Sequence, residues 1–190
     1  MSEGFSGYGP MASPALNSDE LEARLEELHE ASYGWACSCC GWNETEAEDV
    51  LQNAYVKVIS GRAAFDGRSA FRTWLFGVIR LTAMERHRRN RSMQKKEDRV
   101  VARLDPSDAV VEPGDPAERA ERAQLLKEAL EALPDRQREV LHLVFYEDMT
   151  IKEAADAMAV SIGSARVHYD RAKKKLRALL AEKAPGGGVR

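Results

Sequence analysis

The residues that decide the fold are 150–180, which read TIKEAADAMAVSIGSARVHYDRAKKKLRALL. Thr150 and Glu153 form a T-x-x-E pattern, in which each side chain accepts a hydrogen bond from the backbone N–H of the other residue at the start of a helix. The helix that starts there is expected to end at a short turn over residues 159–161. Ser161, the last residue of that turn, can cap a second helix. The pattern therefore predicts two helices joined by a tight turn.

The second of these helices combines an apolar stripe with a basic face. Its apolar residues recur at spacings of four, three and four, which places them on one buried face of a helix: Ala165, Tyr169, Ala172 and Leu176. Its basic residues point elsewhere: Arg166, His168, Arg171, Lys173, Lys174 and Lys175. A short helix, a tight turn and a second helix with a basic face predict a helix-turn-helix that reads duplex DNA. The alternative is a pair of ordinary amphipathic helices with a solvated basic face.

Charge along the chain is divided into blocks. The chain has 190 residues, of which 44% are hydrophobic, so it can form one large core or two small ones. The net charge is −10 over residues 1–49, +9 over 50–104, −8 over 105–165 and +6 over 166–190, which together give −3. Two basic blocks separated by an acidic one predict two surfaces that contact phosphates.

Prolines divide the chain between the two basic blocks. Three prolines fall within residues 104–116, and proline disfavours helix, so this acidic segment is predicted to be a flexible linker. The predicted fold is therefore all-α, with two small helical domains at 17–103 and 117–182 and tails at 1–16 and 183–190. Without a signal peptide or a run of about 18 apolar residues, we expect a cytoplasmic protein that does not insert into membranes.

Three helices are predicted in the N-terminal domain, the first of them over residues 16–40. Thr45 and Glu48 form a second T-x-x-E pattern, which predicts the start of the next helix. The apolar stripe of that helix comprises Val50, Leu51, Ala54, Tyr55, Val58 and Ile59. The buried series of the third helix comprises Phe71, Trp74, Leu75, Val78, Ile79 and Thr82.

The third helix continues into a dense basic cluster at residues 86–91, followed by Lys95 and Lys96. Aromatic residues beside dense arginine suit single-stranded or distorted DNA, in which bases stack on rings and phosphates meet cations. The alternative for Phe71 and Trp74 is that both side chains simply belong to the core.

Three cysteines lie between Trp35 and Trp42, at Cys37, Cys39 and Cys40. A reducing cytoplasm disfavours a disulfide. A complete zinc site needs four ligands, and the sequence offers no second cysteine pair and only His29 nearby. We therefore expect small buried hydrophobic residues and no metal site, with redox or metal sensing as the alternative.

Motifs of the common enzyme classes are missing from the sequence. It contains no P-loop, no G-x-S-x-G and no H-E-x-x-H, and its four histidines are scattered. The expectation is a protein that is not an enzyme, with no catalytic residues and no cofactor.

Three segments and the helix-turn-helix after them resemble a known family. The segments read AEDVLQNAYVKVI at 47–59, FDGRSAFRTWLFGVIR at 65–80 and LPDRQREVLHLVF at 133–145. In this order and spacing they resemble a bacterial RNA polymerase sigma factor of the sigma-70 family. The group resembled is the small extracytoplasmic-function (ECF) class, which keeps only regions 2 and 4, and the resemblance covers roughly residues 20–180.

The resemblance implies two surfaces in region 2. Its helix at 47–60 matches the part that docks on the clamp helices of the polymerase largest subunit. The exposed candidates for that contact are Asp49, Gln52, Asn53 and Lys57. The candidates that match the part opening and holding the −10 element are Arg72, Trp74, Arg80, Arg86, Arg88, Arg89, Asn90 and Arg91.

In region 4, the resemblance implies that the helix at 161–174 enters the major groove at the −35 element. The candidates for that contact are Ser164, Arg166, Val167, His168, Arg171, Lys173 and Lys174. Arg166 and Arg171 are expected to carry most of the discrimination, because arginine reads guanine edges bidentately. The lysines at 173–175 are expected to hold phosphates.

Partners follow from the same resemblance: core RNA polymerase through its clamp helices and flap, promoter DNA, and an anti-sigma factor. The acidic linker resembles the segment that runs through polymerase channels. The chain departs from the family at Leu81 (usually asparagine), Gly77 (commonly arginine), Ala159 (usually glycine) and Ile162 (often polar), which is expected to alter promoter preference rather than the fold. The alternatives are a free-standing helix-turn-helix regulator that binds operators without polymerase, and an adaptor that sequesters a regulator.

Overall fold

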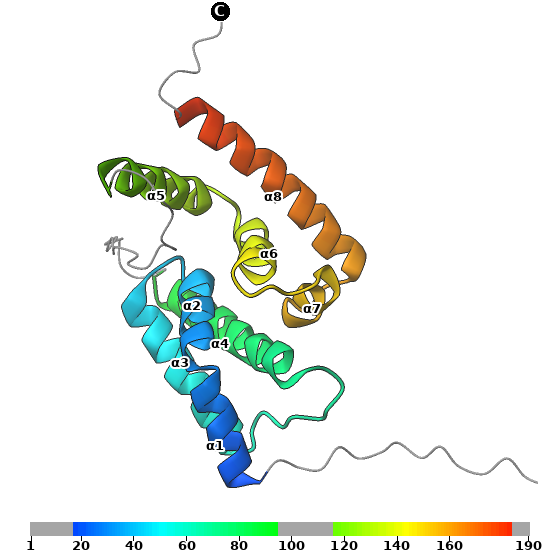
Figure 1. The fold of residues 1–190 in the computed structure, drawn as a ribbon. Coiled ribbons are helices and arrows are strands. Elements are labelled where there is room, and N and C mark those ends of the chain that lie inside the picture. The colour runs from blue at the N-terminus through cyan, green and yellow to red at the C-terminus, as the bar shows by residue number, and fades with distance from the viewer. Residues whose placement is uncertain (1–16, 95–115, 184–190) are drawn as a thin grey trace, which may run out of the picture.

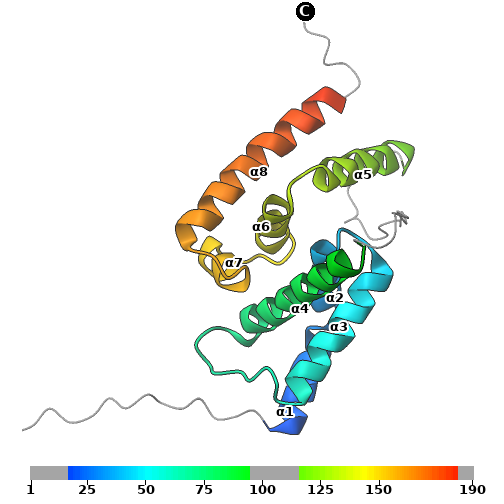
Figure 2. The same ribbon diagram turned by 180° about the vertical axis from the view of Figure 1, so that it is seen from behind.

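The computed structural model describes residues 17–94 and 116–183 of the chain. Within these two ranges the structure contains eight α-helices and no strand: α1 (Ser18–Glu27), α2 (His29–Cys39), α3 (Glu44–Ile59), α4 (Phe71–Gln94), α5 (Pro116–Glu131), α6 (Asp135–Phe145), α7 (Ile151–Ala157) and α8 (Ile162–Lys183). Figures 1 and 2 show two groups of helices, with α1–α4 below α5–α8. The all-α prediction is confirmed. The predicted C-terminal tail begins one residue too early, because Lys183 is the last residue of α8. The rest of that tail, the N-terminal tail and nearly all of the predicted linker lie outside the described residues, as do Lys95 and Lys96.

The first predicted helix is in fact two helices. Asn17 caps α1, and its side chain accepts a hydrogen bond from the N–H of Glu20 at 2.8 Å. Leu28 then ends α1 and begins α2, because its backbone (φ −95°, ψ 6°) leaves the helical region. The Leu28 N–H still bonds to the Arg24 carbonyl at 3.2 Å. The chain therefore changes direction at Leu28 without an intervening loop.

The predicted cap of α3 is wrong by two residues. Asn43, rather than Thr45, caps the helix, and its side chain accepts a hydrogen bond from the N–H of Glu46 at 3.0 Å. Asparagine is as good a cap as threonine, and the helix begins at Glu44, directly after Asn43. Ile59 was also placed wrongly on the buried stripe, since it is 68% exposed at the last residue of the helix.

The helix-turn-helix is formed by α7, a turn and α8. Thr150 and Glu153 make the predicted reciprocal capping box, which is confirmed. Ser161 accepts a hydrogen bond from the N–H of Ser164 at 3.1 Å and so caps α8 as predicted. In the turn, Ala159 has φ 51°, a left-handed conformation that glycine adopts more easily than alanine.

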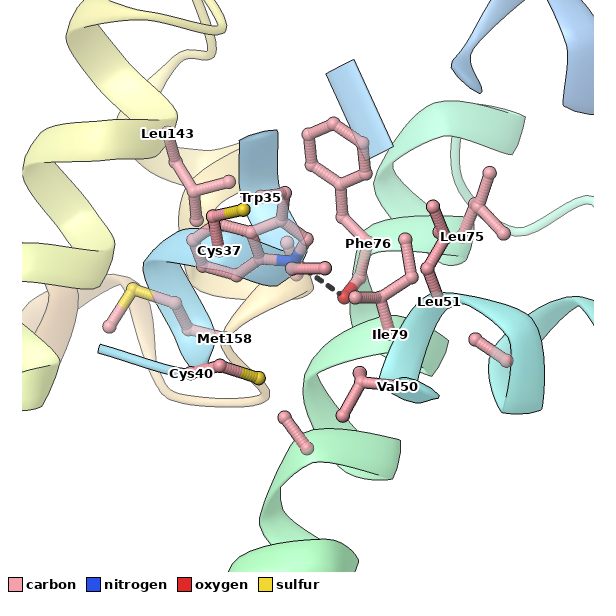
Figure 3. Close-up of a cluster of buried hydrophobic side chains, with 14 of the residues drawn as sticks. Trp35, Cys37, Cys40, Val50, Leu51, Leu75, Phe76, Ile79, Leu143 and Met158 are labelled. Atoms are coloured by element: carbon pink, nitrogen blue, oxygen red, sulfur yellow. Dashed lines mark hydrogen bonds between the residues drawn. The ribbon is translucent and has the colours of Figure 1, made fainter. Parts of the chain in front are cut away.

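One hydrophobic core joins the two groups of helices (Figure 3). At its centre Trp35 of α2 is fully buried, and its indole N–H donates to the Phe76 carbonyl at 2.9 Å. Leu143 of α6 and Met158, the C-cap of α7, pack in the same core. Phe76, which the predicted stripe of α4 left out, is also fully buried. The reason is that α4 packs against α2 and α3 and also against α7.

Candidate nucleic-acid interface

The outer face of α8 has the character expected of a recognition helix. Five of its predicted DNA contacts are exposed: Ser164, Arg166, Val167, Arg171 and Lys174. The other two, His168 and Lys173, are half-buried. Ala165 and Ala172 are fully buried on the opposite side, which confirms the predicted stripe. Lys173 lies over the Tyr169 ring, with its Nζ 4.2 Å from the ring centroid. The helix therefore presents both long basic groups and an exposed valine to a groove.

The predicted polymerase-binding residues lie on α3. Gln52 and Asn53 are exposed. Asp49 and Lys57 are half-buried, and both form ion pairs with residues of α4. Asp49 pairs with Arg86 at 2.8 Å. The Lys57 ammonium lies 2.8 Å from the Glu85 carboxylate and donates to Thr82 Oγ1 at 3.0 Å.

Exposed apolar residues that the sequence prediction missed lie on the same helices. On α3, Val56 is 50% exposed in addition to Ile59. Leu81 and Met84 of α4 are exposed as well. The available signal was that Val56, Leu81 and Met84 fall outside the predicted apolar stripes. Exposed apolar side chains that lie together mark protein–protein contacts.

An aromatic cluster stands at the start of α4. The ring centroids of Phe65, Phe71 and Trp74 lie 5.3 Å apart in each of the three pairs. Phe71 is buried, so for this residue the core alternative holds, whereas Trp74 is half-exposed. Trp74 is therefore held in place by the cluster with part of its surface still accessible.

The basic cluster at the end of α4 has two kinds of residue. Arg88, Arg89 and Arg91 are exposed, as phosphate-contacting groups should be. Arg86 is paired with Asp49, and the Asn90 amide donates to Glu46 Oε1 at 3.3 Å. Arg86 and Asn90 thus connect α4 to α3.

Two of the predicted −10 residues are engaged with the other group of helices. Arg80 is only 3% exposed, and its Nε lies 3.1 Å from Glu139 Oε2 of α6. Arg72 is ion-paired with Glu147, which follows α6. In this arrangement Arg80 is shielded from DNA, whereas Arg72 is held by Glu147 with about a third of its side chain still exposed.

The two carboxylates respond differently to their burial. Burial raises the pKa of Glu139, although the Arg80 charge opposes that effect. For Glu147 burial alone would also raise the pKa, but hydrogen bonds from His142 and Arg72 outweigh it and lower the pKa. Glu147 is therefore stabilised as a carboxylate between the two groups of helices.

Helices α4 and α7 approach closely at Gly77. A Cβ atom built on Gly77 would lie 3.7 Å from the Ala157 carbonyl oxygen, which is ordinary contact distance. A methyl group therefore fits at this position. A longer side chain at this position would start from the face of α4 that packs on α7.

Comparisons with known proteins agree with this architecture. The family description Sigma-70 region 2 matches residues 25–93, and Sigma-70, region 4 matches residues 123–176. The RNA polymerase sigma factor CnrH of Cupriavidus metallidurans is 30% identical over 174 residues, which cover 89% of this chain and 91% of that protein. The chain belongs to the sigma-70 family of sigma factors.

Other relatives indicate the class of this sigma factor. The ECF RNA polymerase sigma factor SigX of Bacillus subtilis is 27% identical over 140 residues, 71% of each chain. Among solved structures, the sigma factor RpoE of Bartonella quintana, in complex with the anti-sigma factor NepR, has a TM-score of 0.71 at 23% identity, covering 87% of this chain and 99% of that one. CnrH in complex with the cytosolic domain of CnrY has a TM-score of 0.60 at 24% identity, covering 88% and 92%. The chain is an ECF sigma factor with the fold of these two structures.

The cysteines of this sigma factor are mostly core residues, as expected. Cys37 and Cys40 are buried, and burial raises the pKa of Cys40 to about 12. A thiol with so high a pKa carries little thiolate, which argues against redox sensing at this residue. His29 was wrongly taken as the histidine nearest to the cysteines, because it lies beside Tyr55 whereas His87 of α4 reaches Cys40.

Across residues 17–94 and 116–183, no helix is both long enough and apolar enough to cross a bilayer.

Proposed function

We propose that this sigma factor is the non-catalytic promoter-specificity subunit of a bacterial RNA polymerase and works in the cytoplasm. In this proposal α3 binds the clamp helices of the largest subunit through Asp49, Gln52, Asn53 and Lys57. Val56 and Ile59 lie three residues apart on the same helix and are exposed, and burial against a protein partner would remove their apolar surface from water. Region 4 binds the polymerase flap. The two domains, at 17–103 and 117–182, contain nearly all of the described helices.

At the −35 element, α8 enters the major groove. The exposure of Arg166 and Arg171 opposite the buried alanines supports their role in base recognition. Exposed Lys174 and its lysine neighbours hold phosphates. Trp74 and the exposed arginines of residues 86–91 act at the −10 element, where a stacked aromatic ring and cations suit an opened strand.

Alanine substitutions on α8 test this division of labour. R166A is expected to relax preference at one base pair of the −35 element, with a loss of discrimination of about 1–3 kcal/mol. K174A is expected to weaken binding to all sequences alike and to reduce the salt dependence by about one phosphate contact. The measurement is holoenzyme binding across a promoter library at several salt concentrations. If both variants lower affinity uniformly, the assignment of Arg166 is wrong.

We infer that the described structure is the closed form of the protein. The observation that carries this inference is the engagement of Arg72 and Arg80 with Glu147 and Glu139. Arg80 can contact DNA only after the two helix groups separate, and the same separation would release Arg72 from Glu147. The covalent length of residues 95–115 permits this, since fully extended chain of that length reaches roughly 70 Å.

Transcription with core polymerase discriminates this function from the alternatives. Run-off transcription on genomic DNA is expected to give specific start sites only when core polymerase and the sigma factor are both present. A free-standing helix-turn-helix regulator would instead shift specific DNA in a gel without polymerase. An adaptor would direct no transcript at all.

An anti-sigma factor is the further partner we propose. The structures of RpoE and CnrH contain such partners, NepR and CnrY. On this chain, Phe145 and Tyr146 are exposed at the end of α6 and border a pocket of about 270 Å³. An apolar segment of an inhibitor would be recognised there. An F145D/Y146D variant should keep run-off activity while escaping inhibition by the cognate anti-sigma domain.

A further inference from the structure

One cluster of side chains that could hold a metal ion lies beside the basic cluster of α4. Cys40 follows α2, Glu46 lies in the first turn of α3, and His87 lies on α4. One potential ligand atom from each residue lies within 4.8 Å of the other two. Cys40 is 6% exposed, and the other two are half-buried. The sequence could not indicate this cluster, because its members come from the end of α2, from α3 and from α4, and the first and last lie 47 positions apart.

Hydrogen bonds around the cluster already orient two of its members. His87 Nε2 lies 3.2 Å from the Cys39 carbonyl oxygen. Since a carbonyl can only accept, Nε2 is the donor in this contact, which leaves Nδ1 as the ring nitrogen for a ligand. The Asn90 amide donates to Glu46 Oε1, which leaves the other carboxylate oxygen available. Histidine and carboxylate ligands of metal sites are typically held by such partners.

The chemistry of the cluster fits one divalent ion in particular. A thiolate, an imidazole and a carboxylate are the ligand types that Zn²⁺ combines, at about 2.0–2.3 Å. Tetrahedral ligands at those distances lie roughly 3.3–3.8 Å apart, so small side-chain rotations would close the cluster. The charges of a thiolate and a carboxylate balance those of the ion, and the thiol proton leaves to solvent. Of the nearby cations, Arg86 is paired with Asp49 and Arg80 with Glu139. The pocket beside Cys40 and His87 is also lined by Arg88, Arg91, Arg136 and Arg138.

We propose that Cys40, Glu46 and His87 bind Zn²⁺ with a fourth position left to water or an incoming ligand. A site with three protein ligands exchanges its ion more readily than a closed structural site. Cys40 and His87 also line a pocket of about 330 Å³ that α6 borders through Asp135 and Glu139. The ion would therefore join α3, α4 and the residue that ends α2, beside the contact between regions 2 and 4.

Metal titration of the untagged full-length chain tests the proposal. The chain is stripped with a chelator, and Zn²⁺ is added in competition with a chromophoric chelator. One equivalent is expected to bind and to raise the melting temperature. E46Q and H87Q, which change half-buried residues, are expected to weaken binding at least tenfold. H29Q and C37A are the matched controls, because they change a histidine and a cysteine outside the cluster.

Cobalt adds a readout that depends on the sulfur ligand. Co²⁺ added to the wild-type and C37A chains is expected to give a thiolate-to-metal charge-transfer band, which C40A should lose. If C40A does not fold, the E46Q and H87Q titrations still decide. The proposal would be overturned if the wild type bound no detectable Zn²⁺, if E46Q and H87Q bound as tightly as the wild type, or if H29Q or C37A abolished binding.

Discussion

Arg80 is almost fully buried, which is rare for an arginine, and its partner Glu139 is only 7% exposed. A buried ion pair adds little net stability over a well-packed apolar pair, since both charges lose their water. Removal of one partner is far more damaging, at about 3–5 kcal/mol, because it leaves a buried charge unpaired. In this sigma factor the unpaired arginine can regain water if the two helix groups separate.

The substitution E139Q is therefore expected to favour the open form. Small-angle X-ray scattering should show a larger radius of gyration than for the wild type, and binding to −10 single strands without polymerase should improve. E131Q is the matched control, since Glu131 is exposed at the end of α5. A lower melting temperature with an unchanged radius of gyration would mean that the pair serves stability alone.

Glu147 gives the closed form a dependence on pH. Its pKa is lowered from an ordinary value of 4.5, so its stabilising contribution is complete above that value and is lost as the pH falls through the lower folded-state pKa. The difference in unfolding free energy between wild type and E147Q should therefore be largest near neutral pH and shrink on acidification below about 4.5. Urea unfolding of both chains between pH 7 and pH 3 measures it. A difference that does not vary with pH would contradict the role of the charge.

At the scale of helices, the sequence predicts what is local. The helix-turn-helix follows its capping box and its apolar spacing, because Thr150, Glu153 and Ala165 act within a turn or two of themselves. The start of α3 was missed because Asn43 and Thr45 are equivalent caps, so the choice between them depends on the surroundings. The burial of Arg80 could not be predicted, since its partner Glu139 lies 59 positions away on a helix of the other group. The same holds for the cysteine–glutamate–histidine cluster.

The contact of α4 with α7 offers a test at the scale of one interface. G77A should be accepted and should stabilise α4 by about 0.5–1 kcal/mol, because a Cβ has room and alanine favours helix. G77R should separate α7 from α4 and raise the exposure of Arg72 and Arg80. Hydrogen exchange of α7 and binding to −10 single strands report the separation. Equal protection of α7 in both variants would contradict the close approach at Gly77.

Across the whole molecule, the two helix groups share a core rather than a thin polar contact. Trp35, Leu143 and Met158 are buried there, and separation would expose much of their surface. Exposure of apolar surface costs roughly 25 cal/mol per Å², so the closed form is favoured when the protein is alone. Binding to polymerase and promoter DNA must supply the compensating free energy. The central claim is therefore that this sigma factor opens when it joins the transcription machinery.

The most direct test is the distance between the two helix groups in the working complex. Fluorophores can be attached through reactive unnatural amino acids that replace Arg62 and Arg177, so that the cysteines stay unmodified. Arg62 is exposed in the part of the chain that contains α1–α4, and Arg177 is exposed on α8. Energy transfer between them is measured in the free protein and in a transcribing complex with core polymerase. The account predicts efficient transfer in the free chain and a marked loss in the complex. Unchanged transfer in a complex that initiates transcription would contradict it.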